Sequence, residues 1–250
     1  MRASNRLILV ALLVTLLSLV EYDLRLKTAY ESGNYKIPFS DYIALPWKDF
    51  DIVDLNASTA ANVKFVQGPF SVRIDERALD YVVIHQQANR LQIDARFKGS
   101  YLFNRNPYIL IVSCPRLSAL YTDATYRAND HQVTDTIVRE DWNMRQVLID
   151  GFRQDSLSVI QDYGSTVVLS NNIIRSFHAS IGESKGAGPK LMLQSSNQFQ
   201  DADLIIGQKS KFQLENALIP NLSYQLADSA QLILNGNAQG LFYHSKIHQK

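Results

Sequence analysis

The sequence has little cysteine and no excess of charge of either sign. Cys114 is the single cysteine among 250 residues, so the chain can form no intramolecular disulfide. This residue ends an apolar run, which predicts a small buried side chain rather than a reactive thiol. The 25 Lys and Arg residues nearly balance the 24 Asp and Glu residues, so the basic excess expected of a nucleic-acid-binding protein is missing. No catalytic, metal-ligating or cofactor-binding pattern stands out, and we expect no cofactor.

The amino-terminal residues predict membrane targeting. Arg2 and Arg6 precede an apolar run that starts at Leu7 and ends at Val20. A basic segment followed by an apolar one is typical of a signal sequence or signal anchor. No small-x-small cleavage motif follows, so we expect an uncleaved anchor, and a cleaved signal peptide with an exported domain is the alternative. Basic residues ahead of the run place the amino terminus in the cytoplasm and the rest of the chain outside.

The second half of the chain repeats short apolar alternations, which predict strands, at a nearly fixed spacing. One series comprises Leu157, Val159 and Gln161, then Phe177, Ala179 and Ile181, then Ala202, Leu204 and Ile206, then Leu222, Tyr224 and Leu226. A second series comprises Val167 and Leu169, Leu191 and Leu193, Phe212 and Leu214, and Leu232 and Leu234. A fixed period indicates stacked units, so we predict an all-β chain with a single-stranded β-solenoid of roughly 20 residues per coil. Regular strand spacing also fits an antiparallel sandwich, which stays open as the alternative.

The predicted organisation has five parts. Residues 1–33 form the hydrophobic anchor and a juxtamembrane helix that stops at Gly33. Residues 34–47, which include Pro38 and Pro46, form an extended tether. Residues 48–115 form a β-rich cap, residues 116–240 the solenoid, and residues 241–250 a carboxyl-terminal tail. The segment 182–189 is an insertion at one corner of a coil, where stacked strands tolerate extra residues.

The order of these features resembles a known family. The segments that carry the resemblance are FDIVDL (50–55), NVKFVQGPF (62–70), RLQI (90–93) and YILIVSCPRL (108–117). They are similar to the head GIN domain family, also named auto-transporter adhesins, of Bacteroidota envelopes. The Ser-Gly pairs typical of that family's turns are absent here. The resemblance covers about residues 48 to 240 and implies a β-solenoid exported to the bacterial envelope, with its domain in the periplasm. It supplies no catalytic residues.

Candidate ligand-binding residues are few. Four lysines fall at one corner of neighbouring coils and would attract an anionic glycan or a lipid headgroup, although a solubilising edge fits them as well: Lys185, Lys190, Lys209 and Lys211. We therefore predict a non-enzymatic module that binds an envelope polysaccharide or protein, or acts as a scaffold.

A carbohydrate-active β-helix enzyme, a lyase or a hydrolase, is the alternative function. Such an enzyme needs clustered acids on one outer face. Asp201 and Asp203 share a strand face, but Asp203 aligns with Ser158, His178 and Ser223 rather than with a second carboxylate. The histidines, including His178, are predicted to be isolated rather than metal ligands. We therefore expect no catalytic or metal site.

Overall fold

The computed structural model describes residues 3–33, 39, 42–98, 108–136, 146–217, 219–240 and 246–249, which fall into two compact units, Met1–Tyr42 and Ile43–Lys250. In the first unit, helix α1 (Ala3–Ser32) ends at Gly33, whose φ of 68° ends the helix as the sequence predicts. Within it, Ser4–Ser32 is long and apolar enough to cross a membrane, a property that signal sequences share. Half of the predicted tether lies outside the described residues, and its residues 42–45 form strand β1.

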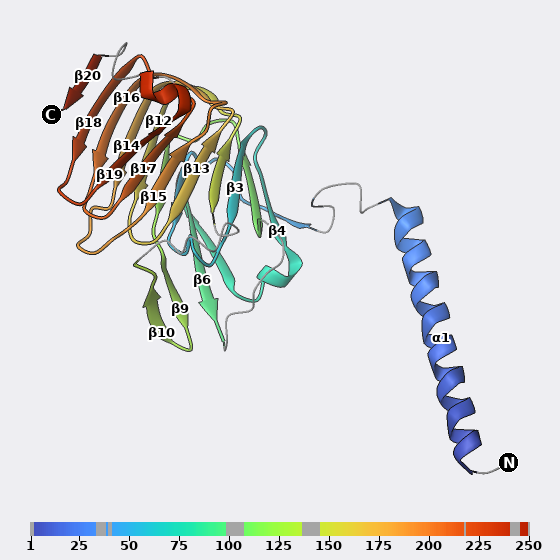
Figure 1. Cartoon of the computed structure of the whole chain (residues 1–250). Helices are drawn as coiled ribbons and strands as arrows, with labels where there is room; N and C mark the ends of the chain where they lie inside the picture. The colour runs from blue at the N-terminus through green and yellow to red at the C-terminus, as the bar shows by residue number, and fades with distance from the viewer. Residues whose placement is uncertain are drawn as a thin grey trace. The chain divides into compact units, whose positions relative to one another are not determined.

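The second unit consists mainly of two sheets (Figure 1). Sheet A contains, in spatial order, β1 (Tyr42–Leu45), β4 (Ser71–Asp75), β7 (Leu110–Cys114), β3 (Val63–Gln67), β11 (Val147–Asp150), β13 (Thr166–Ser170), β15 (Lys190–Leu193), β17 (Lys211–Glu215) and β19 (Gln231–Asn235). Sheet B contains β10 (His131–Thr134), β9 (Thr125–Ala128), β6 (Arg90–Phe97), β2 (Ile52–Leu55), β8 (Ala119–Thr122), β12 (Arg153–Gln161), β14 (Ile173–Ile181), β16 (Gln198–Ile206), β18 (Asn221–Leu226) and β20 (Lys246–Gln249), with β5 (Val82–Gln87) beside β6. Two short 3-10 helices, η2 (Glu76–Ala78) and η3 (Gly236–Gly240), complete the described elements.

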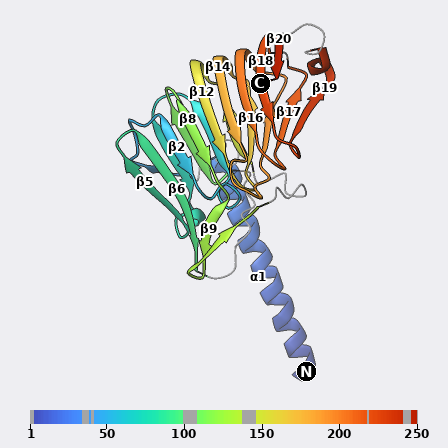
Figure 2. The ribbon, with the colours of Figure 1, turned by 90° about the vertical axis from the view of Figure 1, so that its left-hand side faces the viewer.

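From β11 onward the chain alternates between the two sheets, and successive strands of each sheet pair in parallel. In sheet B, Leu157 pairs with Phe177, Phe177 with Ala202, and Ala202 with Leu222, so the predicted alignment of the first series is confirmed. The second series is aligned in the same way in sheet A. Parallel pairing excludes the antiparallel sandwich for this half of the chain. Figure 2 shows β12, β14, β16 and β18 side by side in chain order.

The core lies where the inward side chains of the two sheets meet. Apart from Gln161 and Leu226, both series belong to one cluster or pack against it, and large residues such as Phe177 and Phe212 are no more than 1% exposed. Burial of one such side chain contributes roughly 1.5–3 kcal/mol. Gln161 takes the position that Ile181 holds in the next strand, and its amide donates to the carbonyl oxygen of Lys190 at 3.1 Å. The amide nitrogen is thus satisfied, whereas the buried Oε1 atom has no hydrogen-bond partner among the described residues, so this polar side chain carries a cost in the series.

The corners from sheet A to sheet B repeat a left-handed backbone conformation. Four residues in equivalent turns have positive φ: Gly151, Asn171, Asn216 and Gly236. Glycine and asparagine adopt this conformation at the lowest cost. Beside these turns, Asn172 and Asn197 are buried, and Asn197 Oδ1 accepts from the backbone N–H of Asn172 at 3.0 Å. At the turns, some backbone N–H and C=O groups no longer form hydrogen bonds within a sheet. The side chains of these two asparagines form hydrogen bonds with such groups instead.

The 48–115 block supplies strands to both sheets. Strand β3 pairs in parallel with β11 and β7, and β2 pairs in parallel with β8 and β6. The antiparallel pairs β4–β7, β5–β6 and β9–β10 lie toward this end of the sheets. The two sheets therefore run through the predicted boundary at residue 115, because the later strands β8 and β11 pair with β2 and β3 of this block.

Candidate functional site

Sheet B presents two columns of polar side chains on its outer face. Side chains alternate along a strand, so the residues between buried positions point away from the core. The register places them side by side in two columns, one of Ser158, His178, Asp203 and Ser223 and one of Ser156, Ser176, Asp201 and Asn221. We call these the His178 column and the Asp201 column.

Asp203 is the most connected member of the His178 column. Ser223 Oγ donates a hydrogen bond to Asp203 Oδ1, and His178 Nδ1 lies 3.7 Å from Asp203 Oδ2. The side chains of His178 and Asp203 are 44% and 42% exposed, so water screens their attraction. The same exposure leaves both groups accessible to a ligand that donates and accepts hydrogen bonds.

The Asp201 column lies beside it and completes a hollow of 460 Å³. Asn221 Nδ2 donates to Asp201 Oδ1 at 2.7 Å. Members of both columns line the hollow, and its floor is the strand segment at Phe177, Ala202 and Leu222, whose side chains are buried in the core. The lining therefore combines carboxylate, amide, hydroxyl and imidazole groups.

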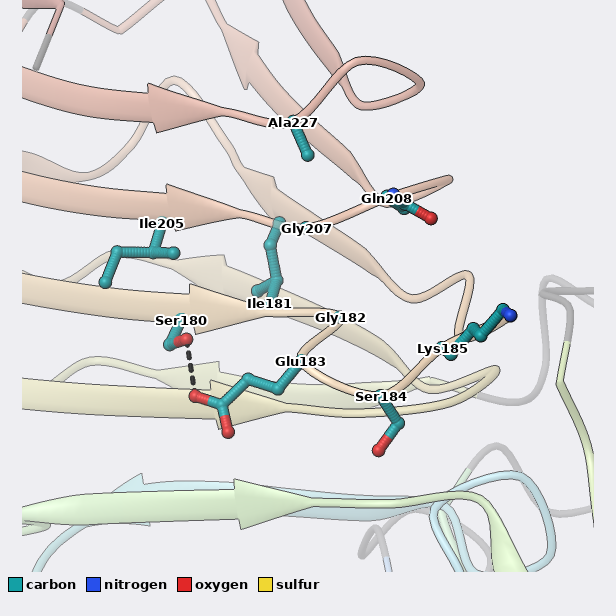
Figure 3. A pocket seen from close by; sticks show the side chains of 10 residues that line it. All are labelled: Ser180, Ile181, Gly182, Glu183, Ser184, Lys185, Ile205, Gly207, Gln208 and Ala227. Carbon is teal, nitrogen blue, oxygen red and sulfur yellow. Dashed lines mark hydrogen bonds between the residues drawn. The ribbon is translucent and has the colours of Figure 1, made fainter.

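A second hollow, of 480 Å³, lies at the corner that follows β14 (Figure 3). Ser180, on β14, donates from Oγ to Glu183 Oε1 at 2.7 Å. The Lys185 side chain extends away from this pair in Figure 3. Gly207 forms part of the lining, and a Cβ atom at this position would lie 1.9 Å from the carbonyl oxygen of Gly182. The corner therefore requires glycine for the close approach of two turns.

The two hollows follow one another along the same pair of strands. Ser180 lies two residues after His178 on β14, and Ile205 lies two residues after Asp203 on β16, so each pair shares the outer face. From residue 176 to residue 182 a strand advances about 20 Å at 3.3 Å per residue. The two hollows therefore follow one another toward the corner carrying Lys185, with polar groups in the first hollow and the exposed apolar side chain of Ile205 in the second.

The structure places the four predicted lysines at this corner. Lys190 and Lys211 are register partners at the starts of β15 and β17. Lys185 lines the corner hollow, and Lys209 lies in the next turn with a φ of 60°. The backbone N–H of Lys209 donates to the Ser229 hydroxyl at 3.0 Å. Two of the four lysines are therefore adjacent in sheet A, and the other two belong to corner turns.

His178 is not isolated, contrary to the sequence prediction, because Asp203 lies on the neighbouring strand. The alignment of the repeats already placed residue 178 opposite residue 203. The corner insertion lies between these two residues, so the distance between them in the chain differs from the usual repeat length. Among the described residues, no group of three or more His, Cys, Asp or Glu side chains could hold a metal ion. Cys114 is fully buried, as predicted, and burial raises the pKa of its thiol to about 12.

A smaller hollow of 220 Å³ lies between β6 and β9. Its lining carries charges of both signs, including Asp94, Arg96, Asp123 and Arg127. Burial raises the pKa of Asp123, and hydrogen bonds from the Ala124 backbone and from Thr125 oppose the shift. Asp94 Oδ1 accepts from Asn56 at 2.7 Å. Mixed charge and internal bonding make this hollow the weaker candidate.

No family model and no curated protein matches the chain. Among solved structures, a "putative adhesin" from Parabacteroides distasonis ATCC 8503 is 12% identical over 77% of this chain and 80% of its own, with a TM-score of 0.47. A "putative adhesin" from Bacteroides fragilis NCTC 9343 is 10% identical over 78% and 92%, with a TM-score of 0.37. A "putative lipid binding protein" from Parabacteroides distasonis ATCC 8503 is 13% identical over 84% and 96%, with a TM-score of 0.34. Likenesses of this size assign neither a family nor a function.

Proposed function

We propose that this chain is an envelope-anchored β-solenoid that binds polysaccharide without chemical change, through the outer face of sheet B. The alternation of strands between two parallel sheets supports the solenoid, since each passage through both sheets adds one coil. Helix α1 supports the anchor, with the amino terminus in the cytoplasm and the sheets in the periplasm. A cleaved signal peptide would leave the same sheets exported.

The two adjacent polar columns carry the proposal. Carboxylate groups such as those of Asp201 and Asp203 accept hydrogen bonds from ligand hydroxyls, and the Asn221 amide both donates and accepts. Repetition on neighbouring strands suits a ligand that repeats its own groups. Carboxylates outnumber Lys185 in the lining of the two hollows, which favours a neutral polysaccharide rich in hydroxyl groups over an anionic one.

The alternative, a carbohydrate-active enzyme, has less support from the same residues. A glycosidase needs two carboxyl groups flanking the bond to be broken. Here Asp201 Oδ1 accepts from Asn221 and Asp203 Oδ1 accepts from Ser223. The register partners of each aspartate are polar but not acidic. The columns therefore resemble a hydrogen-bonded surface more than an acid–base pair.

Retention on glycans tests the proposal. The full chain, inserted in nanodiscs, would be passed over immobilised peptidoglycan fragments and over neutral and uronic-acid-containing envelope polysaccharides, and the glycan sizes followed by mass spectrometry. We expect retention with intact glycan, a loss of roughly tenfold in affinity for Asp203→Asn combined with His178→Ala, and no loss for Gln213→Ala on the outer face of sheet A.

Each other result would count against the proposal. Shortened glycans would favour the enzyme and direct attention to Asp201 and Asp203. Retention that Gln213→Ala weakens equally would contradict the assignment to sheet B. No retention on any glycan would overturn the polysaccharide proposal and favour a protein ligand.

A further inference from the structure

The last coil of the stack leaves its core partly open. In earlier coils the inward residues are buried, as Phe212 and Leu214 are at 0% exposure. Their register partners in β19, Leu232 and Leu234, are only partly buried. In sheet B, Leu226 is 38% exposed. Apolar side chains that would be covered by a further coil are therefore in contact with water at this end.

Strand β19 is the edge strand of sheet A at the same end. It pairs with β17 on one side, and no described strand pairs with its other side. Sheet B continues for one more strand, β20, so at this end sheet A stops one strand earlier than sheet B. An edge strand presents unpaired backbone N–H and C=O groups that can template another strand.

Charged residues disappear from sheet A at this edge. Lys190 and Lys211 stand at the first position of their strands, and their register partner in β19 is Gln231. Glu215 at the end of β17 is followed in register by Asn235. Charged side chains, lysine above all, are a common means of preventing edge-to-edge pairing. Strand β19 lacks that protection at the position where the inner strands carry charge.

The sequence of β19, QLILN, is compatible with pairing to itself. In an antiparallel pair related by a two-fold axis through Ile233, Leu232 would face Leu234 of the second copy, and Gln231 would face Asn235. Opposite residues in an antiparallel pair point to the same side of the sheet. The inward leucines of both copies would thus share one core, and neutral amides would meet at both ends. An interface of this kind is isologous, as two-fold dimers require.

From these observations we infer that β19 is a homodimerisation edge, at which a second copy of this chain completes sheet A by antiparallel pairing. The partner is a second copy rather than a foreign strand because the uncharged, nearly palindromic QLILN segment complements itself. This inference is independent of the proposed polysaccharide site, which lies on the other sheet.

Substitution of Ile233 tests the inference. Its register partner is Gln213, whose own partner is Met192, and this column points to the outer face of sheet A. Ile233→Lys would place two like charges opposite one another at the two-fold axis without entering the core. Gln213→Lys adds the same charge to the same face one strand inward and is the matched control. Circular dichroism and the unfolding midpoint would verify that both variants fold.

The measurement is the mass of the full chain in detergent micelles, by light scattering corrected for detergent, as a function of concentration. We expect a dimer whose dissociation constant rises roughly tenfold or more for Ile233→Lys and is unchanged for Gln213→Lys. Ile233→Cys should form a disulfide-linked dimer under mild oxidation, whereas Gln213→Cys should not. A monomer at every concentration, a dimer that survives Ile233→Lys, or a dimer that both lysine variants abolish would each overturn the inference.

Discussion

Asn197 lies buried at the corner where the chain passes from sheet A to sheet B, and its replacement by alanine measures what the corner contributes to stability. Its Oδ1 accepts from the backbone N–H and the side-chain amide of Asn172, at 3.0 and 2.9 Å. Its Nδ2 donates to the carbonyl oxygens of Leu169 and Gln194, at 2.7 and 2.8 Å. All four bonds are lost in Asn197→Ala.

The expected magnitude follows from the partners that remain. The carbonyl of Leu169 still accepts from the Gln194 N–H, that of Gln194 still accepts from the Asn197 N–H, and the Asn172 amide still donates to Ile149. The backbone N–H of Asn172 has no other hydrogen bond among the described contacts, so it becomes a buried unsatisfied donor, which costs about 1–3 kcal/mol. The other three bonds contribute about 0.5–1.5 kcal/mol each. We expect a loss of about 3–5 kcal/mol in the free energy of unfolding, a large part of the stability of an ordinary domain.

Urea unfolding of the full chain in detergent, followed by far-UV circular dichroism, would measure this loss. Gln225→Ala, at an exposed position of β18, is the control and should change stability by less than about 0.5 kcal/mol. Asn197→Asp should cost at least as much as alanine at pH 7, because it buries a carboxylate against two carbonyl oxygens, and should recover as the pH falls and the carboxyl is protonated. A loss below about 1 kcal/mol for Asn197→Ala, or no pH dependence for Asn197→Asp, would refute this reasoning.

Three further predictions concern other parts of the chain. Because burial raises the pKa of Cys114 to about 12, a thiol reagent at pH 8 should label it only after unfolding, and labelling of the folded chain at the rate of a free thiol would contradict this. Gly207→Ala should destabilise by about 2–3 kcal/mol, because its Cβ atom would meet a backbone oxygen 1.9 Å away; an unchanged melting temperature would count against the tight corner. Asp150 lies 2.8 Å from Lys64 Nζ, and although burial alone would raise its pKa, hydrogen bonds from Lys64 and Asn171 lower it overall. Asp150→Asn should therefore lower the free energy of unfolding by about 1 kcal/mol at pH 7. This difference should stay constant above about pH 5 and disappear as the pH falls through the lowered pKa of Asp150. Unfolding measured from about pH 3 to 8 would show it.

The sequence by itself determined the helix end at Gly33, the strands of the second half and their register. Alternation has a period of two residues, so a slip of one residue would turn a whole apolar series toward water. Leu157, Phe177, Ala202 and Leu222 can therefore be aligned from the alternation alone. The corner insertion is recognisable for the same reason, since it shifts the spacing without disturbing the alternation on either side.

Only the tertiary structure decided which aligned polar groups come into contact. The sequence aligns His178 with Asp203, and the structure adds that His178 Nδ1 lies 3.7 Å from Asp203 Oδ2, because β14 and β16 pair in parallel. The buried bonds between Asn172 and Asn197 likewise depend on the stacking of two turns, and either residue alone has the sequence pattern of an ordinary turn. Strands β2 and β3 join the same two sheets as the later coils, although no repeat marks them. A periodic pattern fixes which face of a strand is buried, whereas contacts between strands depend on how the chain returns at each corner.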